Sequence, residues 1–383
     1  MLYNYEFYLP ARIIMEENGI KKVPSLVKEY GMEHPMLLTD SFLVNLDFTK
    51  DLIESIPNVK VFTDIEVNPS IPSVAKVAQF IKENEIDGIV TLGGGSCMDT
   101  AKAASVEASE GVGIFSFLDG NPNKLPITKS LPIIALPTTS GTGSEVSQYA
   151  VITNPETLRK DSITTSLIVP KVAILDPMLT LNLPRKLTIA TGLDVLSHAL
   201  ESVLSKLDNS FTDVLALEAI KKVFTWLPVC VKEPQNLEAR KEMAFASNLA
   251  GIAMSHCCGT LPHGMGCPLS GHFQVPHGLA VGVIQKYALM YLDDYRSEDV
   301  YRVVKYVDPT YAGEAKEARL QLIQMIENLF DEIECPQDLA EFHLTDEGIE
   351  KMVEDAWVHG CTGLNPSPVD KDLIRTIYKA LKG

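Results

Sequence analysis

One carboxylate and three imidazoles in the middle of the chain have the residue types of a metal site. Asp194 and His198 lie four residues apart in a segment with a helical pattern, so both side chains share one helical face. His263 and His277 follow in a stretch rich in glycine and histidine, each within a Pro-His-Gly sequence. Such a set suits a divalent first-row metal such as iron or zinc. By spacing alone, the histidines after His198 that could complete it are His256, His263, His272 and His277.

A glycine-rich loop upstream of this set is typical of a phosphate-binding turn. An apolar run ends in Gly93, Gly94 and Gly95, and a helical pattern begins near Ser96. Glycines allow a sharp turn and let backbone N–H groups approach a pyrophosphate, and the helix N-terminus adds positive partial charge. The pattern is not Gly-x-Gly-x-x-Gly, and a plain strand-to-helix turn has the same composition. Together with the metal set, the loop suggests metal-assisted hydride chemistry.

A second polar loop, residues 136–145, follows another apolar run. Thr138, Thr139 and Ser144 carry hydroxyl groups that can hydrogen-bond ribose and phosphate. The loop comes directly after an expected strand, where open α/β sheets bind ligands. A flexible surface turn would have a similar composition, but two such loops in one domain favour a nucleotide site.

Asp40 ends an early apolar run and is a third candidate for nucleotide binding. An acidic residue at this place commonly accepts from the hydroxyls of an adenosine ribose and repels a 2′-phosphate. A loop aspartate or a helix N-cap for the residues after Ser41 would fit the pattern equally well.

The composition excludes several classes of protein. A net charge of −17 argues against nonspecific binding to nucleic acid or to an anionic membrane. No apolar run reaches the roughly 20 residues that a transmembrane helix needs, and the first ten residues do not form a signal-peptide pattern. Seven cysteines without a CxxC pair favour reduced thiols in the cytoplasm. The adjacent Cys257 and Cys258 are interpreted as small buried hydrophobes.

The elements that must position these residues change in character along the chain. In the first half, short apolar runs alternate with amphipathic segments, which indicates a parallel α/β sheet. The expected strands cover residues 35–39, 58–62, 88–92 and 131–136, and a helix is expected over 73–84. Beyond residue 184 long helical patterns dominate, over residues 186–206, 210–227, 237–255, 281–290, 315–329 and 345–357.

At 383 residues the chain is too long for one ordinary core, and its length predicts two domains. We predict an α/β dinucleotide-binding domain with a parallel, Rossmann-like sheet over residues 1–180. An all-helical, metal-binding catalytic domain is predicted over residues 181–383. Because cofactor sites usually lie at domain interfaces, the active site is expected in the cleft between the two.

Taken together, the motifs resemble those of the iron-containing, or group III, alcohol dehydrogenases. The resemblance runs from Phe7 to Pro366, which is essentially the whole chain. The matching segments are 93–102, 136–145, 175–177, 192–198 and 263–278. The resemblance implies the architecture that this family shares with the dehydroquinate synthases, and a metal-dependent exchange of hydride between NAD(H) and a small alcohol or aldehyde.

The resemblance also assigns residues to roles. It implies that Asp194, His198, His263 and His277 bind Fe²⁺, with Zn²⁺ as the second choice. It places the NAD contacts on Asp40, Gly94, Gly95, Ser96, Asp99, Thr138, Thr139 and Lys160, to which the loops themselves add Gly93 and Ser144. Positions that usually line the substrate pocket are occupied by Met254, Cys267 and Cys361.

The chain departs from the family pattern after the third ligand. Many members read His-Gly-Met-Ala-His-Pro, whereas residues 263–268 read His-Gly-Met-Gly-Cys-Pro, so that Cys267 replaces a candidate proton relay. His272, a Cys267 thiolate, or water together with the cofactor ribose could carry the proton instead. His256 is a second departure, because the family commonly has asparagine there.

The resemblance implies a cytoplasmic enzyme that forms a homodimer or a larger homo-oligomer and binds neither nucleic acid nor membrane. A hydroxyacid–oxoacid transhydrogenase is an alternative, because that related branch also lacks the second histidine. A lyase of the dehydroquinate synthase type is a further alternative. It would need several basic residues for its anionic substrate, and residues 185–280 contain few.

Overall fold

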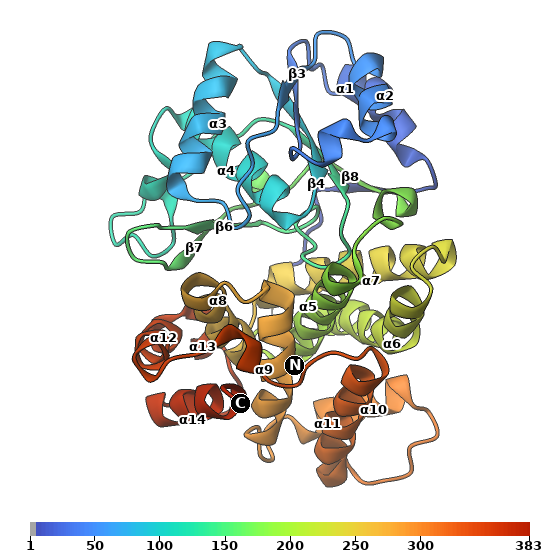
Figure 1. Cartoon of the computed structure of the whole chain (residues 1–383), viewed down its shortest axis with the longest axis vertical. Coiled ribbons are helices and arrows are strands. Elements are labelled where there is room, and N and C mark those ends of the chain that lie inside the picture. The colour runs from blue at the N-terminus through green and yellow to red at the C-terminus, as the bar shows by residue number, and fades with distance from the viewer. Residues whose placement is uncertain (1–4) are drawn as a thin grey trace. The chain divides into compact units, whose positions relative to one another are not determined.

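The computed structural model describes residues 5–383, and the chain divides into two units with separate hydrophobic cores. Residues Tyr8–Leu181 form an α/β unit, and Asn182–Gly383 form a helical unit to which residues 5–7 also belong. Figure 1 traces both units.

The α/β unit is built on a six-stranded sheet in which every neighbouring pair of strands is parallel. In spatial order the strands are β1 (Arg12–Met15), β8 (Val172–Leu175), β5 (Ile133–Pro137), β4 (Gly88–Gly93), β2 (Pro35–Leu38) and β3 (Lys60–Phe62). A separate antiparallel ribbon joins β6 (Tyr149–Thr153) and β7 (Lys160–Thr164). The prediction of a parallel α/β sheet is confirmed, and the four expected strands are present with slightly different ends.

Helices cover both faces of this sheet. They are α1 (Val23–Glu29), α2 (Asp47–Ser55), α3 (Ile71–Glu83) and α4 (Gly95–Glu110). Neighbouring residues of β2 enter opposite cores, because side chains alternate along a strand. Met36 and Leu38 pack with residues of α3 and α4, whereas Leu37 packs with residues of α1 and α2. Strands buried on both faces are continuously apolar, which is why these short runs could be recognised in the sequence.

The order of the strands reverses between β2 and β4. After β3 the chain returns to the other side of β2, and it adds β4, β5 and β8 in that direction. In open α/β sheets ligands bind outside the carboxyl ends of the strands at such a switch point. Asp40 follows β2 and the three glycines end β4, so two candidate nucleotide segments flank this point.

The helical unit has no strand among residues 182–383. Its helices are α5 (Arg185–Leu204), α6 (Ser210–Lys232), α7 (Leu237–Cys257), α8 (Leu261–Phe273), α9 (His277–Met290), α10 (Ser297–Val307), α11 (Ala315–Glu332), α12 (Asp346–Val358), α13 (Gly360–Gly363) and α14 (Lys371–Leu381). The predicted all-helical character of this region is confirmed, and short 3₁₀ turns link several elements in both units.

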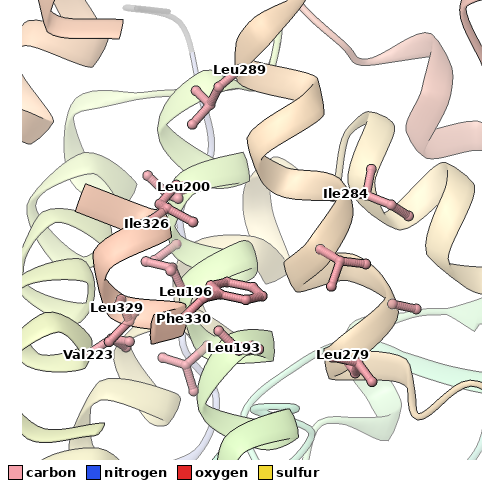
Figure 2. Close-up of a cluster of buried hydrophobic side chains, with 14 of the residues drawn as sticks. Leu193, Leu196, Leu200, Val223, Leu279, Ile284, Leu289, Ile326, Leu329 and Phe330 are labelled. Atoms are coloured by element: carbon pink, nitrogen blue, oxygen red, sulfur yellow. The ribbon is translucent and has the colours of Figure 1, made fainter. Parts of the chain in front are cut away.

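Helix α5 lies at the centre of this unit and contacts α6, α7 and α9. Figure 2 shows Leu193, Leu196 and Leu200 of α5 within a cluster of apolar side chains from α6, α9 and α11. Of the described residues, only α5 has the length and composition of a membrane-spanning helix, and 89% of its most apolar window is buried inside the protein. It is the core helix of the unit, so the polar side chains beyond its first two turns, Asp194, His198 and Glu201 among them, are buried too.

Helix α8 was not expected, because glycine and proline are poor helix formers. Tertiary packing overrides this preference. A Cβ atom on Gly264 would lie 2.1 Å from Oγ1 of Thr362, and one on Gly266 would lie 2.6 Å from Cγ1 of Val281. The glycines let α8 pack closely against α13 and α9, so the composition that argues against a helix serves its packing.

Candidate active site

Helix α5 presents the first two candidate metal ligands from inside the core. Asp194 and His198 are each 3% exposed, and they lie one helical turn apart. His198 Nε2 is 3.7 Å from Asp194 Oδ1. The expectation that both side chains share one helical face is therefore met.

The next two candidates come from the first turns of α8 and α9. The His263 ring stacks on the His198 ring with centroids 4.9 Å apart, and the His277 ring meets the His263 ring edge-on at 5.2 Å. His277 Nε2 lies 3.8 Å from Asp194 Oδ1. A Cβ atom on Gly278 would lie 1.9 Å from the carbonyl oxygen of Ala190, so only glycine lets α9 approach α5 this closely.

The donor atoms of this cluster fit a divalent metal ion. One ligand atom each from Asp194, His263 and His277 lies within 4.8 Å of the other two. Donors placed 2.0–2.1 Å from a common ion at tetrahedral angles are roughly 3.4 Å apart, close to the separations at Asp194. In the described part of the chain, the buried His263 Nε2 and Asp194 Oδ1 have no hydrogen-bond partner. Burial of unsatisfied polar atoms is costly, and a bound cation would remove the cost.

Glu201 supports the third ligand and was missed in the sequence. Its Oε1 lies 2.6 Å from His263 Nδ1, and its Oε2 accepts from the backbone N–H of Thr260 at 2.5 Å. An ionised carboxylate can only accept, so Nδ1 donates its proton to Glu201, and Nε2 is the ring nitrogen that would lose its proton and bind a cation in the cluster. Glu201 follows His198 by three residues on α5, and this spacing is the signal that could have identified it.

The charges of this buried pair stabilise each other. Burial disfavours the charged form of His263, but the Glu201 carboxylate outweighs this effect and raises the histidine pKa to about 9. Burial likewise opposes ionisation of Glu201, yet His263 and the hydrogen bond from Thr260 hold its pKa below the usual value. The carboxylate therefore stays ionised at neutral pH.

In the α/β unit, α4 begins without a capping side chain. Its N-cap residue is Gly94, which makes no side-chain hydrogen bond, whereas Ser70 caps α3 in the usual way. The first-turn N–H groups of α4 are thus left for an anion, as at other phosphate-binding helix ends. This arrangement fits the predicted phosphate loop.

The glycines of this loop are needed for a different reason than expected. Gly93, Gly94 and Gly95 do not have positive φ angles, so this turn does not use the left-handed conformations that glycine allows. Close packing requires them instead. A Cβ atom on Gly93 would lie 2.4 Å from Sγ of Cys97, and one on Gly95 would lie 2.6 Å from Cγ2 of Thr142.

The second polar loop lies beside the first. Thr138 follows β5, and its backbone N–H donates to the carbonyl oxygen of Gly93 at 3.0 Å. The side chain of Thr139 lies 3.3 Å from the position of a Cβ atom on Gly94. The structure thus brings the two predicted loops together at the carboxyl ends of neighbouring strands.

One of the two carboxylate oxygens of Asp40 is hydrogen-bonded to the neighbouring backbone. Its Oδ1 accepts from the backbone N–H groups of Phe42 and Leu43, which makes it a cap for the following 3₁₀ turn. Among the described residues, no hydrogen bond is made by Oδ2. Burial raises the pKa of Cys97 to about 12, and the negative charge of the nearby Asp40 adds to this effect. Asp40 therefore lies near the start of α4.

Asp99 and Ser144 belong to a closed internal network. Asp99 accepts from Ser144 Oγ at 2.7 Å and from the backbone N–H of Val151 at 3.0 Å. The buried Lys102 donates to Ser144 Oγ at 2.9 Å and to the carbonyl oxygen of Tyr149 at 2.8 Å. Lys102 was not singled out in the sequence, because its partners lie far along the chain. This network fixes the second polar loop against α4 and the β6–β7 ribbon.

Ser96 and Lys160 both contact Asn68. The backbone N–H of Asn68 donates to Ser96 Oγ at 3.3 Å, and Lys160 Nζ donates to Asn68 Oδ1 at 2.8 Å. Asn68 thereby links the start of α4 to the β6–β7 ribbon, and it too was missed in the sequence.

Comparison with known proteins now identifies the chain's relatives. Residues 10–177 match the family described as iron-containing alcohol dehydrogenase, and residues 188–382 match the C-terminal domain of the Fe-containing alcohol dehydrogenase family. The chain belongs to this family. It is accordingly an enzyme and an oxidoreductase, as the resemblance implied.

Similar proteins span the whole length of the chain. An NAD-dependent methanol dehydrogenase from Bacillus methanolicus is 29% identical, covering 98% of this chain and 99% of the relative. A 1,3-propanediol dehydrogenase from Citrobacter freundii is 31% identical, covering 98% of both chains. Among solved structures, a sulfoacetaldehyde reductase from Bifidobacterium kashiwanohense in complex with NAD⁺ is 32% identical with a TM-score of 0.90, covering 99% of both chains.

The two residues considered for proton relay in this family member lie in different places. Cys267 is half-buried on α8, one helical turn after His263. His272 is nine residues from His263 on the same helix, roughly 13 Å along its axis. Its Nε2 lies 2.8 Å from Oδ2 of Asp355. The structure therefore brings Cys267, but not His272, near the cluster. His256 is also elsewhere, stacked on Phe7 with centroids 4.4 Å apart.

Proposed function

We propose that this enzyme transfers hydride between NAD(H) and a short-chain alcohol or the corresponding aldehyde, with a divalent metal bound at Asp194, His198, His263 and His277. The observation that carries the proposal is the pair of unsatisfied buried atoms, His263 Nε2 and Asp194 Oδ1, within a cluster of metal-ligating side chains. The family and the names of the relatives support the same chemistry.

In this proposal the two domains bind different groups. Residues 1–180 bind the dinucleotide, and residues 181–383 bind the metal and the substrate. Fe²⁺ is the first choice of metal because the family is iron-containing. Zn²⁺ is the second, because a tighter-binding metal replaces a weaker one when it is available. When bound, the ion supplies a Lewis acid that polarises the substrate oxygen. Glu201 holds the His263 ring in the tautomer and orientation that this binding needs.

In the α/β unit, the uncapped start of α4 receives the pyrophosphate, and the hydroxyls of Thr138 and Thr139 bind phosphate or ribose. The proposed cofactor contacts are Asp40, Gly93, Gly94, Gly95, Ser96, Asp99, Thr138, Thr139, Ser144 and Lys160. The internal bonds of Asp99 and Ser144 give these two the further task of fixing the loop.

Asp40 determines the preference for NAD over NADP. Its Oδ1 is held by two backbone N–H groups, so the carboxylate has a fixed orientation. Oδ2 then accepts from a ribose hydroxyl, and its charge repels a 2′-phosphate.

Because Cys267 replaces the usual histidine, no side chain at that position relays the substrate proton in this proposal, and the proton would leave through water and the ribose of bound NAD. Cys267 shapes the pocket there, and His272 is held by Asp355. We further propose a cytoplasmic location, in keeping with seven cysteines that form no disulfide. A homodimer or a larger homo-oligomer is proposed from the resemblance to the family alone.

The decisive experiment measures steady-state kinetics of metal-free, Fe²⁺-loaded and Zn²⁺-loaded protein. A series of primary alcohols and diols, with the matching aldehydes, is tested with NAD(H) and with NADP(H). We expect activity only in loaded protein, with NAD(H) preferred. Equal turnover by metal-free protein would refute the metal's role. NAD that stays bound through gel filtration, with hydride passed between two organic substrates, would point to a transhydrogenase instead.

A further inference from the structure

Two cysteines outside the proposed ligand set face each other in the helical unit. Cys258 follows the end of α7, and Cys361 lies in α13, a hundred and three residues further along the chain. Their Sγ atoms are 3.7 Å apart. The seven cysteines, all of them described, form no disulfide, so this pair is present as two thiols.

Cys258 differs from its neighbour Cys257 in burial and in pKa, two properties that affect the reactivity of a thiol. Cys257 is fully buried, its Sγ lies 3.1 Å from Oγ1 of Thr212, and burial raises its pKa to about 12. It fits the interpretation of a small buried hydrophobe. Cys258 is only half-buried, and a hydrogen bond from Cys361 lowers its pKa to about 7. Reactive cysteines are of this second type.

The backbone holds Cys258 in a conformation that side chains rarely adopt. Its φ and ψ are 58° and 168°, close to a region that glycine dominates, and its N–H donates to the carbonyl oxygen of Met254 at 2.8 Å. Residues held in such strained conformations cluster at functional sites. The backbone thus fixes the position of this thiol opposite Cys361.

We propose that Cys258 and Cys361 form an oxidisable dithiol that reacts with a peroxide and closes to an intramolecular disulfide. The Cys258 thiolate attacks a peroxide oxygen, which breaks the O–O bond, forms a sulfenic acid and releases hydroxide. The Cys361 sulfur then attacks the sulfenic sulfur, and the S–O bond breaks as the S–S bond forms. Two protons from the thiols complete two molecules of water, so the two sulfurs lose the two electrons that hydrogen peroxide gains.

The order of attack follows from the hydrogen bond between the two sulfurs. Either sulfur could donate in this contact. The pKa of the more deeply buried Cys361 is raised well above the usual value whereas that of Cys258 is lowered, so we expect Cys258 to carry the charge and Cys361 to donate to it. Closure needs the sulfurs to approach by roughly 1.7 Å, to the usual S–S length. Helix α13 is a single turn, and a side chain on Gly360 or Gly363 would meet nothing within 4 Å. The two ends of this turn therefore have room to adjust, although Thr362 between them is packed against α8.

The disulfide would disturb the proposed metal site, and this part of the inference rests on the proposed function. The next two residues after Cys258 support His263. A Cβ atom on Gly259 would lie 2.7 Å from Cβ of His263, and the N–H of Thr260 donates to Glu201, the partner of His263 Nδ1. A pull on Cys258 toward Cys361 is transmitted to this short segment. We expect the oxidised protein to bind its metal less tightly.

The test treats Zn²⁺-loaded protein with about one equivalent of hydrogen peroxide per chain, since zinc does not generate radicals as iron does. We expect a loss of two free thiols and a peptide pair joined through Cys258 and Cys361 in mass spectrometry. Dithiothreitol should restore both thiols. A disulfide that joins Cys361 to Cys267, or oxidation of Cys258 to sulfinic acid without any linked peptide, would overturn the proposal.

Three variants sharpen the result. Cys361→Ser should stop at the sulfenic acid on Cys258, which dimedone traps, and Cys258→Ser should lose no thiol pair. Cys257→Ala, the matched neighbour, should still form the disulfide. If a variant does not fold, the peptide map of the natural chain decides alone.

Zinc content after dialysis against a chelator tests the coupling to the metal. We expect the oxidised protein to lose zinc about 10-fold faster than the reduced protein, as typical for disturbance of an outer partner of a ligand. Equal rates would refute the coupling and leave the dithiol intact. A protein that forms the disulfide but has no dehydrogenase activity would contradict the proposed function, not the dithiol.

Discussion

Two buried clusters of polar side chains, one in each unit of this enzyme, are arranged in opposite ways. In the α/β unit, Asp99 and Lys102 are both hydrogen-bonded to Ser144 and to the backbone of the β6–β7 ribbon, so their buried polar atoms have partners. In the helical unit, Asp194 Oδ1 and His263 Nε2 are buried without a hydrogen-bond partner among the described residues. A closed network supports the fold, whereas an open cluster, in which unpaired buried atoms converge on one point, is suited to bind a cation.

Glu201 and its partner His263 show that a fully hydrogen-bonded side chain can contact one that keeps an unpaired atom. Its two carboxylate oxygens are occupied by His263 and Thr260, so it belongs to the closed class. Yet its partner His263 turns the other ring nitrogen toward the open cluster. A fully hydrogen-bonded group such as Glu201 thus orients an unpaired one such as His263 Nε2. Removal of an unpaired group should reduce metal binding, whereas removal of a hydrogen-bonded group should reduce stability or act on the metal indirectly.

The largest effect is expected where an open atom is removed. His263→Ala should lower metal affinity and kcat/KM by more than ~10³-fold, because loss of a ligand exceeds the 10–100-fold typical of an outer partner. Metal analysis and kinetics measure this. His272→Ala on the same helix is the control and should keep its metal, since His272 is held by Asp355. Full metal occupancy in His263→Ala would show that the ligand set is wrong.

Removal of a closed group should reduce stability instead. Lys102→Met leaves the carbonyl oxygens of Ser147 and Tyr149 without their donor, and we expect a loss of about 3 kcal/mol in unfolding free energy at neutral pH. Urea unfolding measures it. If Lys102→Met left stability unchanged, or lost metal without a change in stability, the proposed difference between the Lys102 network and the metal-ligand cluster would be contradicted.

The same lysine gives a pH test with a definite sign. Burial lowers the Lys102 pKa from 10.5 to about 8, although Asp99 and Glu145 oppose the shift. Between these values the unfolded chain binds the extra proton, so stability should rise with pH from about 8 to 10.5, by up to about 3 kcal/mol. Lys102→Met should lack this rise relative to the natural protein.

Asp40 combines both arrangements, because its Oδ1 accepts two backbone hydrogen bonds and no hydrogen bond to its Oδ2 is made by a described residue. Asp40→Asn keeps an acceptor for the N–H groups of Phe42 and Leu43 but loses the charge. We expect the NAD preference in kcat/KM to relax by roughly 10²-fold, equivalent to about 2.7 kcal/mol. Asp47→Asn, an exposed position on α2, is the control. Equal use of both cofactors by the natural enzyme would refute the role of Asp40.

Glu201→Gln tests a closed group that acts through an open one. The amide still accepts from His263 Nδ1, but it loses the charge and presents N–H donors to Thr260. Metal affinity should fall by 10–100-fold while the fold is retained. Ser202→Ala removes the neighbouring buried hydroxyl, which bonds only to the backbone of His198, and should leave metal affinity unchanged. A drop in stability alone would make Glu201 merely structural.

The sequence predicted best what depends on local pattern. Strands β2 and β4 were recognised because strands buried on both faces are continuously apolar, and Asp194 with His198 because helical spacing is local. Helix α8 was missed, since its glycines conflict with helix propensity and are explained only by Thr362 and Val281 on other helices. Lys102 was missed because its partners are 42 to 47 residues away.

The smallest effect is expected at Cys267, which lies beside the open cluster without belonging to it. At neutral pH a thiol is a poorer proton relay than the imidazole it replaces, and the four proposed ligands match the metal better than a further sulfur would. Cys267→Ser should therefore keep kcat within ~10-fold and mainly shift substrate preference. Cys267→His, which restores the usual family residue, should gain little if the proton leaves through water and ribose. Iodoacetamide should label Cys258 faster than Cys267 in a peptide map. A loss in kcat of more than ~10²-fold for Cys267→Ser, with metal and NAD binding intact, would make Cys267 a catalytic residue and extend the open set by one.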